Sequence, residues 1–415
     1  MRIAIIGGGA AGLMAACTLC DLGEQPVLFE RNDRVGRKLG ITGKGRCNLT
    51  NRSDVQTVLE NIPTNKRFLY GALSRFTPFD VMAYFEDTLG LPLKTERGNR
   101  VFPQSDSAAS ILDCLKRKMR ESGVTVKTGR VLEITTQEGH VTGVRTETEA
   151  LKAKTIILAT GGLSYPATGS TGDGYRMAKE LGHAVVAPQG SLVPLEEAGE
   201  DCSKMQGLSL RNVGVRLVNA KGKVLYKDFG ELLFTHFGVS GPTVLSASCH
   251  LKGEGCRLLI DLKPALEESK LDARLLRDLD MYQNRTMENA LTDLLPRSMI
   301  PVVLDKLQIP RDLQANSLTR QSRHALVMLL KAFPVEIQGK RPVAEAIITS
   351  GGIKTGEVDP KTMASKKIGG LYFAGEILDC DAYTGGFNLQ IAWATAYAAA
   401  LGVKAELAID KSKPL

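Results

Sequence analysis

The first thirty residues alternate between apolar runs and glycine-rich turns in the order strand, helix, strand. Residues 2–6 form a continuous apolar run, which is typical of a parallel strand buried on both faces. Residues 13–22 are predicted to form a helix that ends at Gly23, and residues 26–29 form a second apolar strand that runs into Glu30. This order predicts a βαβ unit.

Three glycines occupy the turn between the first predicted strand and the helix. Gly7, Gly9 and Gly12 form a G-x-G-x-x-G pattern, which allows a tight turn, close approach of a pyrophosphate and close packing of helix and strand. The helix N-terminus offers free N–H groups to phosphates. Glu30 lies where a carboxylate accepts hydrogen bonds from ribose hydroxyls. The pattern predicts a Rossmann-type dinucleotide site that disfavours the 2′-phosphate of NADP.

Three later segments favour FAD over NAD as the bound dinucleotide. Residues 31–51 are rich in glycine and basic residues, which suits a loop laid along a second phosphate and the flavin. Residues 155–162 read as a buried strand that ends in Ala-Thr-Gly, after a strand, turn and strand over residues 124–148. Residues 370–376 read as a strand that runs into Gly-Glu, and a Thr-Gly-Gly-Phe-Asn motif then begins an Ala-rich helix. The N-terminus of that helix is predicted to stabilise the anionic reduced flavin.

Motifs spread over essentially the whole chain carry a family resemblance. GGGAAGLMAA, GKGRCNLTN, GGLSYPATGSTGDGY, FTHFGVSGP and FAGEILDCDAYTGGFNLQIAWATAYAAA together resemble the HI0933/YhiN-type flavoproteins. That family includes enzymes described as aminoacetone oxidases and as 3-dehydro-bile-acid Δ4-reductases (the BaiN type). The hairpin before Ala159-Thr160-Gly161 also resembles the glutathione-reductase-type FAD fold, which implies that Val131 contacts adenine through its backbone.

We predict that the chain binds FAD non-covalently through residues of all these segments, and we predict no metal site. The predicted cofactor-binding residues are Gly7, Gly9, Ala10, Ala11, Gly12, Glu30, Arg31, Arg37, Lys38, Thr42, Gly43, Gly45, Arg46, Cys47, Asn48, Val131, Ala159, Thr160, Gly161, Gly162, Gly375, Glu376, Asp379, Gly386, Asn388 and Leu389.

The middle of the chain follows a different pattern. Short alternating segments in residues 191–266 predict a small antiparallel barrel or sandwich, and part of 333–341 is assigned to it. Leucine and methionine at helical spacing predict a helical subdomain over residues 267–332. The resemblance implies the same layout, with a β-barrel. We therefore expect an α/β fold in which a Rossmann-type, glutathione-reductase-like FAD domain, residues 1–190 and 342–415, is interrupted by these two inserts.

The charge, the apolar segments and the cysteines of the chain predict which class of partner it binds and in which compartment it resides. The net charge is +8, but the basic residues are mixed with acids and no nucleic-acid recognition motif accompanies them, so we expect a small-molecule substrate and no nucleic acid. No stretch approaches the roughly 20 apolar residues of a membrane span. The eight cysteines are irregularly spaced, and Cys17 and Cys20 lie inside the first predicted helix without a second pair. We expect a cytoplasmic protein, of an oligomeric state that the pattern leaves open.

Few side chains qualify as catalytic groups. His236, in a polar, glycine-flanked loop, is the best of the five histidines for a general acid or a substrate contact, with a structural role as the alternative. Tyr165 and Ser164 are flavin-edge or substrate contacts, or they build a turn. Cys47 has no resolving cysteine nearby, so disulfide-reductase chemistry is not expected. Arg341 and Glu345 serve the substrate pocket or form a salt bridge.

These observations predict an FAD-dependent oxidoreductase. As the resemblance implies, NAD(P)H would supply hydride through flavin N5 to an activated C=C bond of a small or steroid-like substrate. The alternative is an oxygen-using oxidase of a small amine that produces hydrogen peroxide. A non-enzymatic or RNA-associated flavoprotein is a third possibility. The chain has no second G-x-G-x-x-G unit, so NAD(P)H would bind transiently in the substrate cavity.

Overall fold

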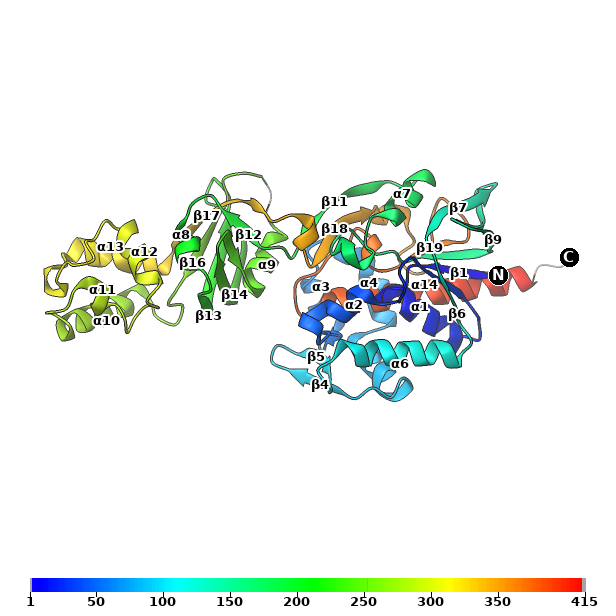
Figure 1. Cartoon of the computed structure of the whole chain (residues 1–415), viewed down its shortest axis with the longest axis horizontal. Helices are drawn as coiled ribbons and strands as arrows, with labels where there is room; N and C mark the ends of the chain where they lie inside the picture. The colour runs from blue at the N-terminus through cyan, green and yellow to red at the C-terminus, as the bar shows by residue number, and fades with distance from the viewer. Residues whose placement is uncertain (1, 252, 413–415) are drawn as a thin grey trace. The chain divides into compact units, whose positions relative to one another are not determined.

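The structure is a computed structural model that describes residues 2–251 and 253–412, with the side chains of the last helix described as far as Ile409. The chain forms two compact units (Figure 1). The first contains the chain up to Ser191 and again from Val343 onward, and the second contains Leu192–Pro342. Because the chain leaves the first unit and returns to it, segments from both ends of the sequence build one fold.

A five-stranded parallel sheet forms the centre of the first unit. Its order is β19-β10-β1-β2-β6. The strands are β1 (Ile3–Ile6), β2 (Val27–Glu30), β6 (Thr125–Thr128), β10 (Thr155–Leu158) and β19 (Leu371–Phe373). Every residue of β1, β10 and β19 is buried, as expected for strands covered on both faces. The predicted α/β fold of Rossmann type with an inserted barrel is confirmed.

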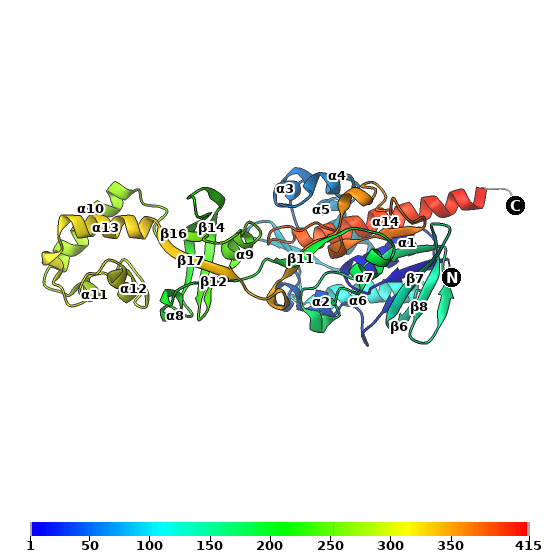
Figure 2. The ribbon, with the colours of Figure 1, turned by 90° about the horizontal axis from the view of Figure 1, so that it is seen from above.

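Two helices of the first unit lie along one another. These are α1 (Ala10–Asp21) and α14 (Phe387–Ser412), which pack together (Figure 2). Helix α1 begins three residues before the predicted start, so that Gly12 lies in its first turn. Trp393 of α14 is fully buried, and its indole N–H donates to the carbonyl oxygen of Leu49 at 2.9 Å.

Smaller sheets and helices complete the first unit. The sheets are β3-β5-β4, β7-β8-β9 and β11-β18. Their strands are β3 (Thr50–Asn51), β4 (Leu93–Glu96), β5 (Arg100–Pro103), β7 (Val131–Gln137), β8 (His140–Thr146), β9 (Ala150–Lys152), β11 (Val185–Ser191) and β18 (Ile348–Ile353). The other helices are α2 (Arg37–Ile41), α3 (Val55–Glu60), α4 (Lys66–Arg75), α5 (Pro78–Ala83), α6 (Ala108–Glu121) and α7 (Asp173–Glu180).

The second unit is a closed antiparallel barrel followed by helices, with a strand that returns to close the barrel. The barrel order is β12-β15-β14-β13-β16-β17. The strands are β12 (Leu195–Glu197), β13 (Ser209–Val218), β14 (Val224–Thr235), β15 (Gly238–Ser240), β16 (Arg257–Asp261) and β17 (Phe333–Lys340). The helices are α8 (Asp201–Lys204), α9 (Pro242–Ser248), α10 (Glu268–Met281), α11 (Met287–Ala290), α12 (Met299–Lys306) and α13 (Arg320–Lys331).

None of the helices found in the described residues has the length and apolar character needed to cross a membrane. Within the same residues, no group of three or more His, Cys, Asp or Glu side chains is arranged to hold a metal ion.

Candidate functional site

The turn between β1 and α1 is shaped by glycines with different tasks. Gly7 has a φ of 106°, and a Cβ there would lie 2.5 Å from the carbonyl oxygen of Ala159. A Cβ on Gly12 would lie 1.8 Å from the carbonyl oxygen of Gly7. At Gly9 no heavy atom lies within 4 Å of a built Cβ. Gly7 and Gly12 are therefore required by packing, whereas Gly9 leaves open space in front of the helix.

The N-terminus of α1 faces this space without a protein cap. Gly9 is the N-cap residue, no side chain caps the helix, and its first turn, which includes Ala10 and Ala11, carries no acidic residue. The first N–H groups of a helix have no partner inside the helix and carry a partial positive charge. Open space beside uncapped N–H groups suits a pyrophosphate.

Glu30 ends β2 beside the glycine turn, and its carboxylate is held by backbone and side-chain donors. It is 8% exposed, and its Oε2 accepts from the N–H of Gly8 at 2.9 Å. Its Oε1 accepts from the backbone N–H of Asn32 at 2.8 Å and from the side-chain amide of Asn32 at 2.7 Å. An ionised carboxylate has about four acceptor sites. These three bonds leave room for one ribose hydroxyl.

The basic residues after Glu30 differ in what they contact. Arg31 pairs with Asp173 at 3.0 Å, and Arg130 joins the same carboxylate at 2.9 Å. Chiefly through Arg130, this pairing lowers the pKa of Asp173 below its usual value. Arg37 donates to the side-chain oxygen of Asn32 at 3.2 Å. Both predicted basic residues are thus held by protein groups near the end of β2.

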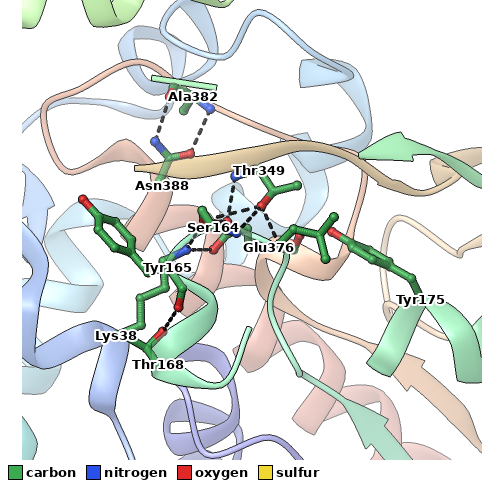
Figure 3. A network of polar contacts seen from close by, with 10 residues as sticks. Lys38, Ser164, Tyr165, Thr168, Tyr175, Thr349, Glu376, Ala382 and Asn388 are labelled. Carbon is green, nitrogen blue, oxygen red and sulfur yellow. Dashed lines mark hydrogen bonds and ion pairs between the residues drawn. The ribbon is translucent and has the colours of Figure 1, made fainter. Parts of the chain in front are cut away.

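Lys38 belongs to a second polar group, which we call the Lys38 cluster: Lys38, Ser164, Thr349 and Glu376 (Figure 3). Lys38 Nζ donates to Glu376 Oε2 at 2.6 Å and to Ser164 Oγ at 2.6 Å. Glu376 Oε1 accepts from Ser164 Oγ at 2.9 Å and from the Thr349 backbone N–H at 2.8 Å. A Cβ on Gly162 would lie 2.3 Å from Thr349 Oγ1, so this glycine lets the strand end approach the cluster.

The loop after α2 is held by unusual backbone conformations and by surface ion pairs. Gly43, Gly45 and Cys47 all have positive φ, and Thr42 Oγ1 donates to the carbonyl oxygen of Leu39 at 2.7 Å. Burial raises the pKa of the Cys47 thiol to about 12, so the thiolate nucleophile is scarce at neutral pH.

Arg46 of this loop is engaged on the protein surface. Its guanidinium donates to Asp106 at 2.8 Å, pairs with Glu96 and lies over the ring of Phe102, 4.2 Å from the ring centroid. The hydrogen bonds that the guanidinium donates to the carboxylates of Glu96 and Asp106 raise the pKa of Arg46.

Two polar atoms in the predicted cofactor segments are buried without a partner among the described residues. Thr160 Oγ1 and Asn48 Oδ1 are buried, and neither makes a hydrogen bond within the part of the chain that the structure describes. Thr160 stands between Ala159 and Gly161 at the end of β10. Buried polar atoms are rarely left unsatisfied in proteins, so both atoms fit a site completed by a polar ligand.

The segment after β19 packs against the first turn of α1. A Cβ on Gly375 would lie 2.7 Å from the Cβ of Ala11. Asn388 forms two hydrogen bonds with the backbone of Ala382, at 2.9 and 2.7 Å, so its amide shapes this segment (Figure 3). A Cβ on Gly386 would lie 2.4 Å from the carbonyl oxygen of Thr50, which makes glycine necessary there.

Two acids in this segment are buried without a cationic partner among the contacts described. Asp379 is 9% exposed and accepts from the Asn65 side chain at 2.9 Å. Burial, aided by Asp381, raises the pKa of the Asp379 carboxyl. Asp381 is 1% exposed and accepts from Ser191 at 2.8 Å and from Ser350 at 3.3 Å.

The remaining predicted residues of the first unit have local roles. Val131 is 4% exposed at the start of β7, and Leu389 is partly buried against the core. Tyr165 has a φ of 53°, and its carbonyl oxygen accepts from Thr168 Oγ1 at 2.7 Å, as in the turn-building interpretation. Glu345 lies in a short 3-10 helix, Val343–Glu345.

The second unit holds His236 and Arg341. His236 lies in the turn between β14 and β15, is exposed, and meets the ring of Phe237 edge-on at 5.0 Å. Arg341 pairs with Glu196 at 2.8 Å and lies over the same Phe237 ring, 4.6 Å from its centroid.

Sequence reasoning missed several residues that hold the site together. These are Asn32, Asn65, Ser191, Thr349, Ser350 and Asp381. All are polar residues whose partners are distant in sequence, except Asn32, which follows Glu30 closely. In the sequence, Thr349 stands beside Ser350 and two glycines in the short segment Ile348–Ile353, and nothing there marks it as a partner of Ser164 and Glu376.

The chain is similar to known proteins along almost its whole length. A family model described as the HI0933-like protein Rossmann domain matches residues 1–402. A 3-dehydro-bile acid delta(4,6)-reductase from Clostridium scindens is 32% identical over 96% of this chain and 98% of its own length. A ribosomal RNA dihydrouridine synthase from Haemophilus influenzae is 30% identical over 96% of this chain and 97% of its own length.

A solved structure shares the fold. The 3-ketosteroid delta1-dehydrogenase from Sterolibacterium denitrificans, solved with 1,4-androstadiene-3,17-dione, covers 98% of this chain and 99% of its own with a TM-score of 0.53. At 14% sequence identity this likeness concerns the fold alone.

Proposed function

The chain belongs to the HI0933-like family of FAD-dependent oxidoreductases, and from this premise we propose that it uses NAD(P)H to reduce a C=C bond conjugated to a carbonyl group. The observation that carries the use of FAD is the uncapped N-terminus of α1, which opens onto free space at Gly9 beside the carboxylate of Glu30.

The names of the two relatives describe one type of reaction. A 3-dehydro-bile acid with 4,6 double bonds has a ketone conjugated to C=C bonds, and the relative from Clostridium scindens is named as a reductase of that system. Dihydrouridine differs from uridine by saturation of a C=C bond that is conjugated to a ring carbonyl, and the second relative is named for making it. Both names support a substrate whose carbonyl activates the bond that is reduced.

The reaction balances with NAD(P)H as the reductant. A hydride goes to the carbon β to the carbonyl, electron density moves to the carbonyl oxygen, and a proton goes to the α carbon. NAD(P)H is oxidised to NAD(P)⁺. FAD, when bound, supplies the flavin ring that takes up and passes on the hydride.

The described residues have separate tasks in this proposal. The first N–H groups of α1 hold the pyrophosphate, and Glu30 holds the ribose. The Lys38 cluster and the segment after Gly375 hold the flavin half. His236 is the proposed proton donor to the α carbon, because its imidazole is exposed and makes no hydrogen bond within the described residues.

Anaerobic mixing tests the reductase proposal. The protein loaded with FAD should be bleached by NADH or NADPH, and the colour should return when a 3-oxo-Δ4 steroid is added but not when its saturated analogue is added. If neither nicotinamide bleaches the flavin, the reductase proposal is wrong. Rapid peroxide formation from a small amine in air, without nicotinamide, would establish the oxidase alternative instead.

RNA is a second candidate substrate, although the mixed charges of the chain and its lack of a recognition motif predicted no nucleic-acid partner. The relative named for ribosomal RNA covers nearly the whole chain, and this chain carries a net charge of +8. Incubation of the FAD-loaded, oxidised protein with unmodified ribosomal RNA, with and without NAD(P)H, followed by mass spectrometry for a 2 Da gain in a uridine, tests this substrate directly. A gain that requires NAD(P)H would support RNA over the steroid.

A further inference from the structure

The two hydroxyl groups of the Lys38 cluster use all of their hydrogen-bonding capacity. Ser164 Oγ donates to Glu376 Oε1 and accepts from Lys38 Nζ and from Thr349 Oγ1, the last at 3.4 Å. Thr349 Oγ1 in turn accepts from the backbone N–H groups of Leu163 at 2.7 Å and Ser164 at 3.1 Å. A hydroxyl has one donor and two acceptor sites, so neither can bind anything further without breaking a bond. Ser164 and Thr349 are both 0% exposed.

Lys38 differs from the hydroxyls because it keeps a donor in reserve. Its ammonium group has three N–H donors, and its two hydrogen bonds, to Ser164 and Glu376, leave one without an acceptor in the described part of the chain. The Lys38 side chain is 20% exposed. A charged donor is thus fixed on two sides and can direct its third N–H to a ligand.

The location of the cluster indicates which ligand that is. Ser164 follows β10 and Glu376 follows β19, at the carboxyl edge of the parallel sheet where open α/β folds bind their ligands. Gly375, directly before Glu376, packs on Ala11 in the first turn of α1. Since that turn holds the pyrophosphate in the proposed function, the cluster begins where the flavin half of the dinucleotide begins.

We propose that Lys38 donates its third N–H to the bound flavin and stabilises its reduced form, so that the Lys38 cluster sets the reduction potential of the cofactor. This inference rests on the FAD binding of the proposed function and extends it. Reduction by hydride places negative charge on the ring, and a fixed ammonium favours the charged state. Glu376 moderates the ammonium charge, and Ser164 and Thr349 are positioning residues.

The charges make opposite predictions for two substitutions. Lys38→Met removes the positive charge and should weaken binding of the reduced flavin relative to the oxidised flavin by roughly tenfold or more. Tenfold corresponds to about 30 mV for a two-electron couple, so the midpoint potential falls by at least that amount. Glu376→Gln removes the negative charge beside Lys38 and should raise the potential. If Lys38 and Glu376 only held the fold together, there would be no reason for the two substitutions to shift the potential in opposite directions.

The experiment measures the midpoint potential of the protein-bound flavin by stepwise reduction in the presence of a reference dye. Neither nicotinamide nor substrate is present. Lys38→Arg, which keeps the charge, should lie between wild type and Lys38→Met. Thr349→Val, which removes the hydroxyl that orders Ser164, should lower the potential, whereas its matched control Thr349→Ser should stay close to wild type.

The outcomes separate this inference from the proposed function. An unchanged potential in Lys38→Met, or shifts of the same sign in Lys38→Met and Glu376→Gln, overturns the inference. If a variant loses FAD during purification, the dissociation constants for oxidised and for reduced FAD are measured separately. Their ratio gives the same information as the shift in midpoint potential. The midpoint potentials of the variants can shift as expected in a protein whose flavin NAD(P)H does not bleach. That result supports the inference about Lys38 and refutes the reductase proposal. A wild-type protein that binds no FAD refutes both.

Discussion

Substituting the second glycine of the turn separates cofactor binding from folding. Gly9→Ala adds a methyl group where no heavy atom lies within 4 Å, so the protein itself has room for it. The methyl group projects into the space in front of the uncapped N-terminus of α1, where the pyrophosphate is expected to approach the backbone. We therefore predict a folded protein that binds FAD poorly.

The expected magnitudes follow from the geometry. Gly9 has a φ of −80°, which alanine adopts without strain, and the reduced freedom of the unfolded chain stabilises the variant by about 0.4–1 kcal/mol. Alanine is a poorer N-cap than glycine, which offsets a similar amount. Without FAD, the net change in the free energy of unfolding should stay within about 0.5 kcal/mol. FAD at a hundredfold its Kd stabilises the wild type by about 2.7 kcal/mol, and the variant should lose this gain.

Thermal unfolding with and without added FAD, together with the flavin absorbance of the purified protein, measures both quantities. The matched control is Gly12→Ala, whose methyl group would lie 1.8 Å from the carbonyl oxygen of Gly7. Overpacking of this kind typically costs about 1–3 kcal/mol, so this variant should be destabilised with and without FAD. A yellow Gly9→Ala protein with the wild-type response to FAD would refute the position assigned to the pyrophosphate.

Three further predictions concern single side chains. Trp393→Phe removes the indole N–H that pairs with the Leu49 carbonyl oxygen in the core. The variant should lower the free energy of unfolding, measured with urea, by about 1–3 kcal/mol. An unchanged midpoint of unfolding would contradict a stabilising role of this hydrogen bond. Burial lowers the pKa of His183 below its usual 6.5. As pH falls through 6.5, the unfolded chain therefore takes up a proton at this residue before the folded protein does, and the stability of the fold declines. When Tm is followed from pH 8 to 5, this decline should be shallower in His183→Asn. His236→Ala should change stability by no more than about 0.5 kcal/mol, because the side chain is exposed. The same variant should reduce turnover by roughly 10²–10⁴-fold, and unchanged turnover and pH dependence would end the assignment of His236 as proton donor.

The beginning of the fold was predictable because its signals are local. The buried strands β1 and β2, the three glycines and Glu30 follow one another within a short stretch, and each has one physical task. The start of α1 was placed too late because the prediction excluded Gly12 from the helix, although its close contact with Gly7 requires it in the first turn.

The interactions that hold the predicted cofactor segments together were harder to predict. Thr349 bonds to Leu163 across 186 residues of sequence, and Asp381 bonds to Ser191 across 190. No periodicity marks such a pair, because each residue looks like an ordinary polar residue in its own segment. The sequence also does not show that the Asn388 amide is used by the backbone of Ala382 or that Arg46 is used by Glu96 and Asp106. The contribution of Asn388 and Arg46 to FAD binding stays a prediction.

The β11-β18 ribbon makes the middle of the chain exchangeable. Ser191, the last residue of the outgoing strand, pairs with Ile348, the first residue of the returning strand, so the two breakpoints are neighbours in the first unit. A foreign domain whose own ends lie close together could be grafted at this point without disturbing the register of the parallel sheet. Evolution, or a protein engineer, can therefore exchange the second unit of such a protein while the parallel sheet of the first unit stays intact.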